Sequence, residues 1–530
     1  MWLAANCSSG PKMMRVKPEI CQFLNRCLIE KSFLVALARA LSFQRGLSMR
    51  TLSFTLFILG TALGWLPAAN AQDAEKPNIV FMMADNLGWG DLGAYGGGEV
   101  RGMPTPEIDA LAAEGLRLTQ FLVEPGCTPT RAATMTSRYS IRSGLSLALI
   151  RGTPNTLQPE EYTMGEMLRD AGYATNYLGK WHLGLDTFSM PQNQGFDSYY
   201  GILNSTDEVN FGERSALSGY ELTEDEKAYV WQGTAGTDGE IVEEYTRDVR
   251  RTIDFELTDR AVAYIEEQSK LDDPFFLFLS FTRPHYPSLM TPEWEGRSVA
   301  GAYGDAVMEL DYNTGRVLDA IDAAGLADNT IVVWMSDNGP WKTMVWPDGG
   351  SAGPFRGELG SAWEGSIRTA GMIRWPGMIE PSVSDEMFST MDFMPSFAAI
   401  VGAEMPSDKP IDGVDQSAFL LGEQEKSNRE SLITFLGDDM MAVRWKHFRI
   451  YFQDVVQAGN GFKRMGGSQS NRVPHNGYPR IYNIKADPRE EDDVGALETW
   501  VVGQYMRVVL EYLATLDEHP NPPASNFTDF

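Results

Sequence analysis

The 530-residue sequence is short of positive charge, cysteine and histidine. Its 44 Lys and Arg stand against 72 Asp and Glu, which gives a formal net charge of −28. So acidic a surface repels nucleic acid and anionic membranes, and we expect neither as a partner. Hydrophobic residues make up 43% of the chain, an ordinary value that indicates neither disorder nor a multispanning membrane protein. The length is ample for a large core in two packed domains.

The first 71 residues have the pattern of a secretory signal. Met49-Arg50 precedes an apolar run over residues 52–65, and Ala69-Asn70-Ala71 matches the small-x-small site of signal peptidase. The run is short for a membrane span, although an uncleaved anchor is the alternative. We therefore expect residues 1–71 to be an extension and signal peptide, with Met49 as the true initiator. The mature protein would be periplasmic or secreted, and not bound to the membrane after cleavage.

Removing this segment changes both the charge and the cysteine content. Residues 1–71 hold eight Lys and Arg and two Asp and Glu, so the formal charge of the remainder is −34. Three of the four cysteines are removed with it, and Cys127 stays as the one cysteine of the mature chain. An internal disulfide is then excluded. Cys127 is either a buried apolar filler or a chemical group.

The order of the predicted elements indicates an α/β fold with a large, mostly parallel sheet. Apolar strands are predicted at residues 78–84, 116–123, 174–178, 275–281 and 330–335, and helices at 105–114, 160–171, 246–270 and 306–324. The character changes near residue 431, where short strands at 432–435, 442–445 and 448–452 follow one another. A helix over 499–516 closes the chain. This part predicts a smaller antiparallel sheet with one helix.

Polar residues follow three of the buried strands directly. They are Asp85-Asn86, His285 and Asp337-Asn338. Because ligands bind beyond the carboxyl ends of parallel strands, one shared site is plausible. The two Asx pairs offer only oxygen ligands, which suit Ca²⁺ or Mg²⁺ better than zinc. A lone Asp-Asn-Gly is more often a turn, but two pairs placed directly after buried strands favour a metal site.

The stretch Gly126-Cys127-Thr128-Pro129-Thr130-Arg131 predicts the start of a helix. Thr128 can cap the helix and Pro129 suits its first turn, so Cys127 and Arg131 would lie where the macrodipole favours an anion. A cysteine in that position is expected to be acidic and reactive. A helix cap with an incidental thiol explains the stretch equally well.

Cys127-x-Pro129-x-Arg131, followed by residues 132–138, resembles the signature of the type I sulfatases. Further stretches resemble the same family in the same order, and the resemblance runs from about Pro77 to the C-terminus. It implies an alkaline-phosphatase-like sandwich with a catalytic domain over residues 72–428 and a C-terminal subdomain over 429–530. The matching stretches are residues 77–80, 85–91, 179–184, 283–285, 336–339, 363–368 and 374–377.

The resemblance also implies the chemistry of a sulfuric ester hydrolase. In the family the cysteine matching Cys127 is oxidised to formylglycine by a formylglycine-generating enzyme, and its hydrate attacks the ester. The implied metal is Ca²⁺, with Mg²⁺ less favoured, and the substrate is a sulfated small molecule or carbohydrate. The implied catalytic residues are Cys127, Arg131 and Lys180 for the anionic oxygens, His285 as general acid and His182 as the base that releases sulfate; the implied metal ligands are Asp85, Asn86, Asp337 and Asn338.

Lys180 and His182 are two residues apart, so on an extended segment they would face the same way. The other histidines, His447, His475 and His519, match no family position and are interpreted as structural or surface residues. Residues 204–239, acidic and irregular, are expected to shape the mouth of the pocket.

One position departs from the family pattern. Leu359 stands where the family commonly has a lysine that contacts the sulfate and the leaving-group oxygen, and Arg356, Arg368 or Lys342 would have to supply that charge. Two alternatives therefore stay open. One is a formylglycine-dependent phosphodiesterase or phosphonate monoester hydrolase, and the other is a non-catalytic protein that binds a sulfated ligand.

Overall fold

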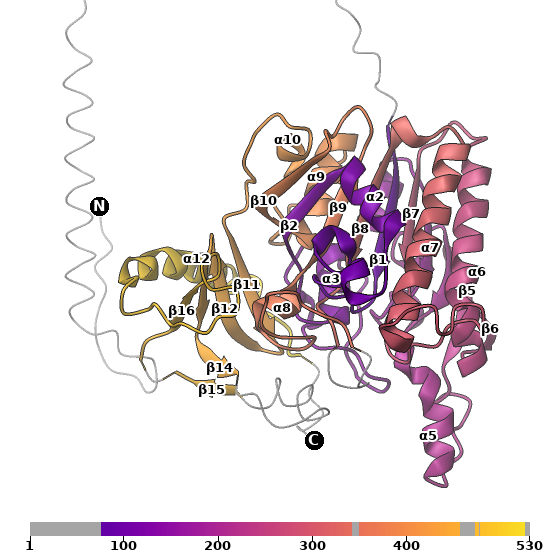
Figure 1. The fold of residues 1–530 in the computed structure, drawn as a ribbon, viewed down its shortest axis with the longest axis horizontal. Coiled ribbons are helices and arrows are strands. Elements are labelled where there is room, and N and C mark those ends of the chain that lie inside the picture. The colour runs from indigo at the N-terminus through magenta and orange to yellow at the C-terminus, as the bar shows by residue number, and fades with distance from the viewer. Residues whose placement is uncertain (1–75, 342–348, 456–471, 476, 525–530) are drawn as a thin grey trace, which may run out of the picture. The chain divides into compact units, whose positions relative to one another are not determined.

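A large twisted sheet runs through the part of the chain that the computed structural model describes, residues 76–341, 349–455, 472–475 and 477–524 (Figure 1). Its strand order is β10-β2-β9-β8-β1-β7-β3-β4-β5-β6. From β8 to β4 neighbouring strands are parallel, whereas β9 and β5 are antiparallel to both neighbours. The strands are β1 (Asn78–Ala84), β2 (Leu116–Leu122), β3 (Ala174–Gly179), β4 (Ser198–Ile202), β5 (Tyr229–Thr234), β6 (Glu240–Glu244), β7 (Phe275–Ser280), β8 (Thr330–Ser336), β9 (Arg368–Arg374) and β10 (Ser382–Ser389).

Helices cover both faces of this sheet, which is why its central strands are continuous apolar runs. Every residue of β1, β7 and β8 is buried. Alternate residues of β1 enter two separate cores: Val80 and Met82 face one, Phe81 and Met83 the other. The first core is completed by α2 (Pro106–Glu114), α6 (Arg247–Gln268) and α7 (Gly301–Ala323), the second by α3 (Cys127–Thr136), α4 (Met164–Asp170) and α9 (Phe393–Val401).

A second, smaller sheet is entirely antiparallel and carries one long helix. Its order is β11-β12-β13-β16, and α12 packs on it through Tyr505 and Tyr512 (Figure 1). The predicted fold class is thereby confirmed, while the predicted limits between domains stay predictions. The elements are β11 (Ser431–Leu436), β12 (Asp439–Trp445), β13 (Phe448–Tyr451), β16 (Arg480–Asn483), the short pair β14 (Gln453–Val455) and β15 (Arg472–Pro474), and α12 (Val502–Thr515).

Some predicted boundaries were wrong for local reasons. The helix expected from residue 160 begins only at Met164, because Thr163 caps it in a reciprocal capping box with Glu166. Residues 204–239 are not irregular: they contain α5 (Phe211–Leu217) and β5. The predicted signal segment lies outside the described residues. Among the helices that are described, none combines the length and apolar composition that a membrane crossing requires.

Candidate active site

The carboxyl ends of four adjacent strands carry most of the predicted site residues. Asp337 follows β8, Asp85 follows β1, His285 comes shortly after β7, and Lys180 follows β3. Main-chain hydrogen bonds continue across these ends: the Asp337 amide donates to Ala84 at 3.0 Å and the Asp85 amide donates to Arg283 at 2.9 Å. The structure thus brings residues from distant parts of the sequence to one edge of the sheet.

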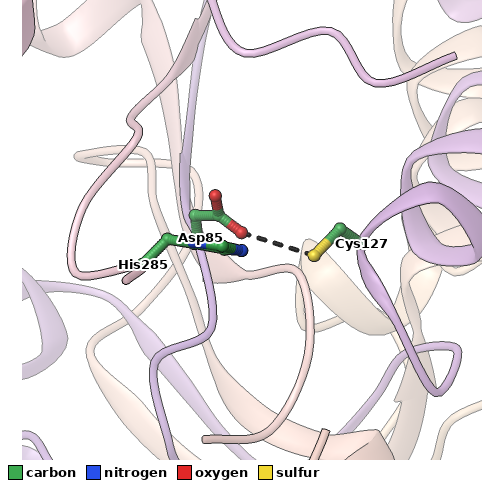
Figure 2. A group of neighbouring side chains, drawn as sticks. All are labelled: Asp85, Cys127 and His285. Atoms are coloured by element: carbon green, nitrogen blue, oxygen red, sulfur yellow. Dashed lines mark hydrogen bonds between the residues drawn. The ribbon is translucent and has the colours of Figure 1, made fainter. Parts of the chain in front are cut away.

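Cys127 faces this edge from the first residue of α3. Its Sγ lies 3.5 Å from Asp85 Oδ1 (Figure 2). The same Sγ lies 3.2 Å from Asn86 Oδ1. The predicted cap was wrong. Gly126 is the N-cap residue, and Thr128 is already within the helix, where its hydroxyl donates to the carbonyl of His182 at 3.0 Å. Asp85, Cys127 and His285 also place one potential ligand atom each within 4.8 Å of the others (Figure 2).

The expectation of an acidic thiol was also wrong. Burial raises the pKa of Cys127 well above its usual value, and the nearby carboxylates of Asp337 and Asp85 raise it further. Lys180 and Arg131 act in the opposite direction but do not outweigh them. The helix N-terminus therefore does not produce a reactive thiolate here.

Two buried ion pairs hold the charged groups of the site. Lys180 Nζ donates to Asp85 Oδ2 at 2.8 Å, and Arg131 donates to Asp337 Oδ2 through Nη2 at 2.9 Å and Nε at 3.2 Å. Against the effect of burial, the positive charge of Lys180, that of His285 when it is protonated and that of Arg131 lower the pKa of Asp85. Burial and the charge of Asp85 raise the pKa of Asp337 to about 6. Two carboxylates and two cations cancel, so a bound divalent cation would leave the site positive and attractive to an anion.

The two asparagines complete an oxygen-rich set. Asn86 adopts a left-handed conformation with φ of 64°, and its amide donates to Asp337 Oδ1 at 2.9 Å. Asn338 Nδ2 donates to Asn86 Oδ1 at 2.7 Å, whereas Asn338 Oδ1 is buried without a hydrogen-bond partner among the described residues. A buried acceptor lacking a donor is costly unless something fills the place. Together with the carboxylates, it makes a donor set that fits a hard divalent cation.

The two histidines present different nitrogens to the pocket. His182 Nε2 is 3.0 Å from the carbonyl of Leu149, so it carries the proton and Nδ1 is left with a lone pair and no partner among the described residues. His285 Nδ1 is 2.6 Å from the carbonyl of Tyr286, which leaves its Nε2 available. Burial lowers the pKa of both. His182 has φ of 61°, so the expectation of an extended segment from Lys180 was wrong.

Beside these groups lies a pocket of about 350 Å³. Cys127, His182, His285 and Leu359 line it, whereas Arg356 and Arg368 do not. The guanidinium of Arg356 stacks 3.9 Å from the Trp363 ring, and that of Arg368 pairs with Glu364 at 3.4 Å. Neither supplies the charge expected at position 359, and Lys342 lies outside the described residues. The histidines interpreted as structural, His447, His475 and His519, are not part of the pocket lining.

Sequence reasoning missed the support beneath His285. Arg250 of α6 is fully buried and donates to the carbonyl of His285 at 3.0 Å and to Thr282 Oγ1 at 2.8 Å. Asp254, one turn on, accepts from the Thr282 amide at 2.8 Å. The sequence did contain an indication of this role. Arg250 precedes Ile253 by three residues and Leu257 by seven, and this helical spacing places its charge on the buried face of the helix. Such a charge requires a partner, and here the partner is the loop that carries His285.

Replacing Arg250 with lysine should lower kcat by about ten- to a hundredfold with little change in KM, because the forked contacts that position the His285 loop are lost. If His285 protonates the leaving group, kcat should fall more for esters of weakly acidic alcohols than for esters of acidic phenols. The matched control is Arg260→Lys on the same helix, where the guanidinium pairs with Glu256 at the surface at 2.9 Å. An equal loss for all leaving groups would mean that Arg250 is merely structural.

The fold is a mixed α/β fold with a buried polar site at the carboxyl ends of its central strands, and the comparisons with known proteins identify the family. The sulfatase family model matches residues 77–403, so the chain belongs to the sulfatase family and is a sulfate ester hydrolase. Steryl-sulfatase of Rattus norvegicus is 32% identical over 548 aligned residues, 88% of this chain and 93% of that protein. Arylsulfatase A of Homo sapiens is 34% identical, over 80% and 84%. The solved structure of PsFucS1 sulfatase from Pseudoalteromonas sp. superposes with a TM-score of 0.79 at 32% identity, over 85% of this chain and 93% of that one.

Proposed function

We propose that this enzyme cleaves sulfate monoesters with a formylglycine made from Cys127 and with a calcium ion held by Asp85, Asn86, Asp337 and Asn338. The observation that carries the proposal is the position of Cys127. Its side chain lines the substrate pocket and also lies 3.2–3.5 Å from side-chain oxygens of Asn86 and Asp85. An oxygen nucleophile at this point is within reach of both the ester and the ligand set. A thiol with a raised pKa is a poor nucleophile there.

The cation, when bound, would supply positive charge for the sulfate oxygens and favour the ionised form of a hydroxyl on the hydrated aldehyde. The chain supplies the rest. The free amides at the start of α3 would favour an anion there, and Arg131 and Lys180 hold the carboxylates in place. Magnesium would need a stricter octahedral arrangement, so the mixed carboxylate and amide set favours calcium.

The two histidines can divide the proton transfers between them. The attacking hydroxyl reacts in its ionised form, with its proton released to solvent. As its oxygen bonds to sulfur, the bond from sulfur to the ester oxygen breaks, and His285 in its protonated form gives a proton to the departing alcohol. The enzyme then holds a sulfate ester with one free hydroxyl. His182, whose Nδ1 lone pair has no partner among the described residues, accepts that proton, sulfate leaves, and the aldehyde returns. Water rehydrates the aldehyde for the next cycle.

The test is the mass of the tryptic peptide 118–131, taken from protein made together with a formylglycine-generating enzyme. Loss of one sulfur and two hydrogens with gain of one oxygen at Cys127, in protein that releases inorganic sulfate from an ester, supports the proposal. An unmodified thiol, in a host that converts a control sulfatase, would refute it and favour the non-catalytic binding protein.

Because leucine stands at position 359, hydrolysis of phosphonate monoesters or phosphodiesters should also be measured. Leu359 lines the pocket where the family commonly has a lysine, so a charge otherwise aimed at the sulfate is absent from the described lining. A phosphonate monoester or phosphodiester would be the competing substrate. Turnover of matched sulfate and phosphonate esters by the same preparation distinguishes the two activities. We also propose a periplasmic or secreted location, on the basis of the sequence pattern in residues 49–71.

A further inference from the structure

A loop over residues 356–365 contacts the active site at two points through its main chain. The amide of Gly360 donates at 2.8 Å to the carbonyl of the residue two before Cys127. The amide of Leu359 donates at 3.1 Å to the carbonyl of the residue two after Asn338. The loop therefore holds the segment that carries Cys127 beside the segment that carries Asn338.

The other side of this loop is held by the C-terminal sheet. On β13, Arg449 Nη2 donates to the carbonyl of Ala362 at 2.6 Å, and the hydroxyl of Tyr451 lies 3.2 Å from the same carbonyl. In the connection after β16, Glu490 Oε2 accepts from the amide of Glu364 at 3.0 Å. The three side chains that hold the loop are at most 1% exposed. Their hydrogen bonds thus form in a low-dielectric interior, where such bonds are strong.

Glu490 is an unusual residue for its place in the fold. Its φ of 56° lies in the left-handed region, which costs free energy for a residue with a Cβ atom. Its carboxylate is fully buried, which costs more unless the carboxylate is hydrogen-bonded. That carboxylate accepts from the amide of Glu364 and from the hydroxyl of Tyr451, and the main-chain carbonyl of Glu490 accepts from Arg356 Nη1 at 3.2 Å. Glycine would suit the backbone better, so the presence of glutamate points to a use for its side chain.

We infer that Glu490 is a positioning residue of the active site. It holds the amide of Glu364, and through the loop over residues 356–365 it fixes the segments that carry Cys127 and Asn338. The inference rests on the proposed function, because it takes Cys127 as the source of the nucleophile and Asn338 as a ligand of the cation. A small displacement of a reacting group slows the chemical step strongly. Loss of the Glu490 carboxylate should therefore lower kcat more than it raises KM.

The test compares three substitutions of Glu490 in the full chain, with formylglycine verified in each protein. Glu490→Ala and Glu490→Gly both remove the carboxylate, and each should lower kcat for an aryl sulfate by about tenfold or more with little change in KM. Glu490→Gly should nevertheless be more stable than Glu490→Ala, because glycine adopts a positive φ without strain. Glu490→Gln should keep most of kcat, since its amide oxygen can accept from the Glu364 amide and its amide nitrogen can donate to the Tyr451 hydroxyl.

Amide hydrogen exchange measures the same constraint without turnover. Exchange in residues 359–366 and 118–131 should be faster in Glu490→Ala and Glu490→Gly than in the parent, and unchanged in Glu490→Gln. Asp493→Asn is the matched control. Asp493 lies in the same connection and accepts from the amides of Ile481 and Gly495 at 3.1 and 2.9 Å, which are outside the loop. This variant should leave both kcat and exchange in the loop as they are in the parent.

Two results would overturn the inference. One is a parent-like kcat in Glu490→Gly, which would mean that Glu490 affects only stability. The other is unchanged kcat and unchanged exchange in Glu490→Ala. An unmodified thiol at Cys127 in the parent, or a parent that releases no sulfate, would refute the proposed function instead, and the exchange measurements would still decide whether Glu490 holds the loop.

Discussion

Replacing Cys127 with serine should reduce multiple turnover by about a thousandfold or more and trap the enzyme as a covalent sulfate ester. A serine hydroxyl can attack sulfur from the same place at the start of α3. It lacks the second hydroxyl from which His182 would take a proton, so the ester has no internal route to release sulfate. Intact-mass measurement of Cys127→Ser after incubation with an aryl sulfate should show the added sulfate group, together with at most one equivalent of released phenol.

Cys127→Ala is the matched control, because it has the same backbone position without any nucleophile. It should show neither the mass increase nor the single equivalent of phenol. Sustained turnover by the serine variant, at a rate near that of the parent, would contradict the need for a geminal diol. It would mean that water or another side chain releases the sulfate group.

The sheet could be predicted from sequence because its central strands are buried on both sides. A run such as residues 78–84 is apolar at every position, and β1 occupies those residues. The position of the site followed from the same pattern, since Asp85 and Asp337 come directly after such runs. Neither result needed knowledge of side-chain contacts. Both depend on the rule that the carboxyl ends of parallel strands meet at one edge.

The errors came from positions where tertiary contacts override local preference. Thr128 is a good capping residue in isolation, yet its hydroxyl donates to the carbonyl of His182, and Gly126 takes the cap position. The thiol of Cys127 lies at a helix N-terminus, yet burial and the charge of Asp337 raise its pKa. Such effects depend on which groups from distant strands lie within a few ångströms, and a linear sequence does not give those distances.

The charge balance of the site also indicates its function. Two buried ion pairs in one place add little to stability, because removing four charges from water costs about as much as their attraction returns. Their pairing at 2.8 and 2.9 Å, beside Asn338 Oδ1, which has no partner among the described residues, agrees with the proposed binding of a cation at this site. With that cation the site has excess positive charge where the sulfate group would lie, and without it the net charge there is zero.

Removal of the cation should therefore abolish activity and measurably lower the melting temperature. A chelator selective for calcium should reduce turnover by about a hundredfold or more, and Ca²⁺ should restore it more fully than Mg²⁺. At a free concentration of about a hundred times Kd, binding adds about 2.7 kcal/mol to the free energy of unfolding, which corresponds to a shift of several degrees. The binding itself can be followed by calorimetry or elemental analysis, independently of turnover.

Asp337→Asn should remove both the Ca²⁺-dependent shift in melting temperature and the turnover, since it deletes one ligand charge and removes the carboxylate that lies nearest to Arg131. Asp305→Asn is the matched control. Asp305 is a buried aspartate of α7 that accepts from the amides of Gly296 and Ser298 at 2.7 and 2.6 Å, outside the site. That variant should be less stable than the parent but should keep the full calcium shift. An Asp337→Asn protein that still gains the same stability from Ca²⁺ would place the ion elsewhere, and the four-residue ligand set would then be wrong.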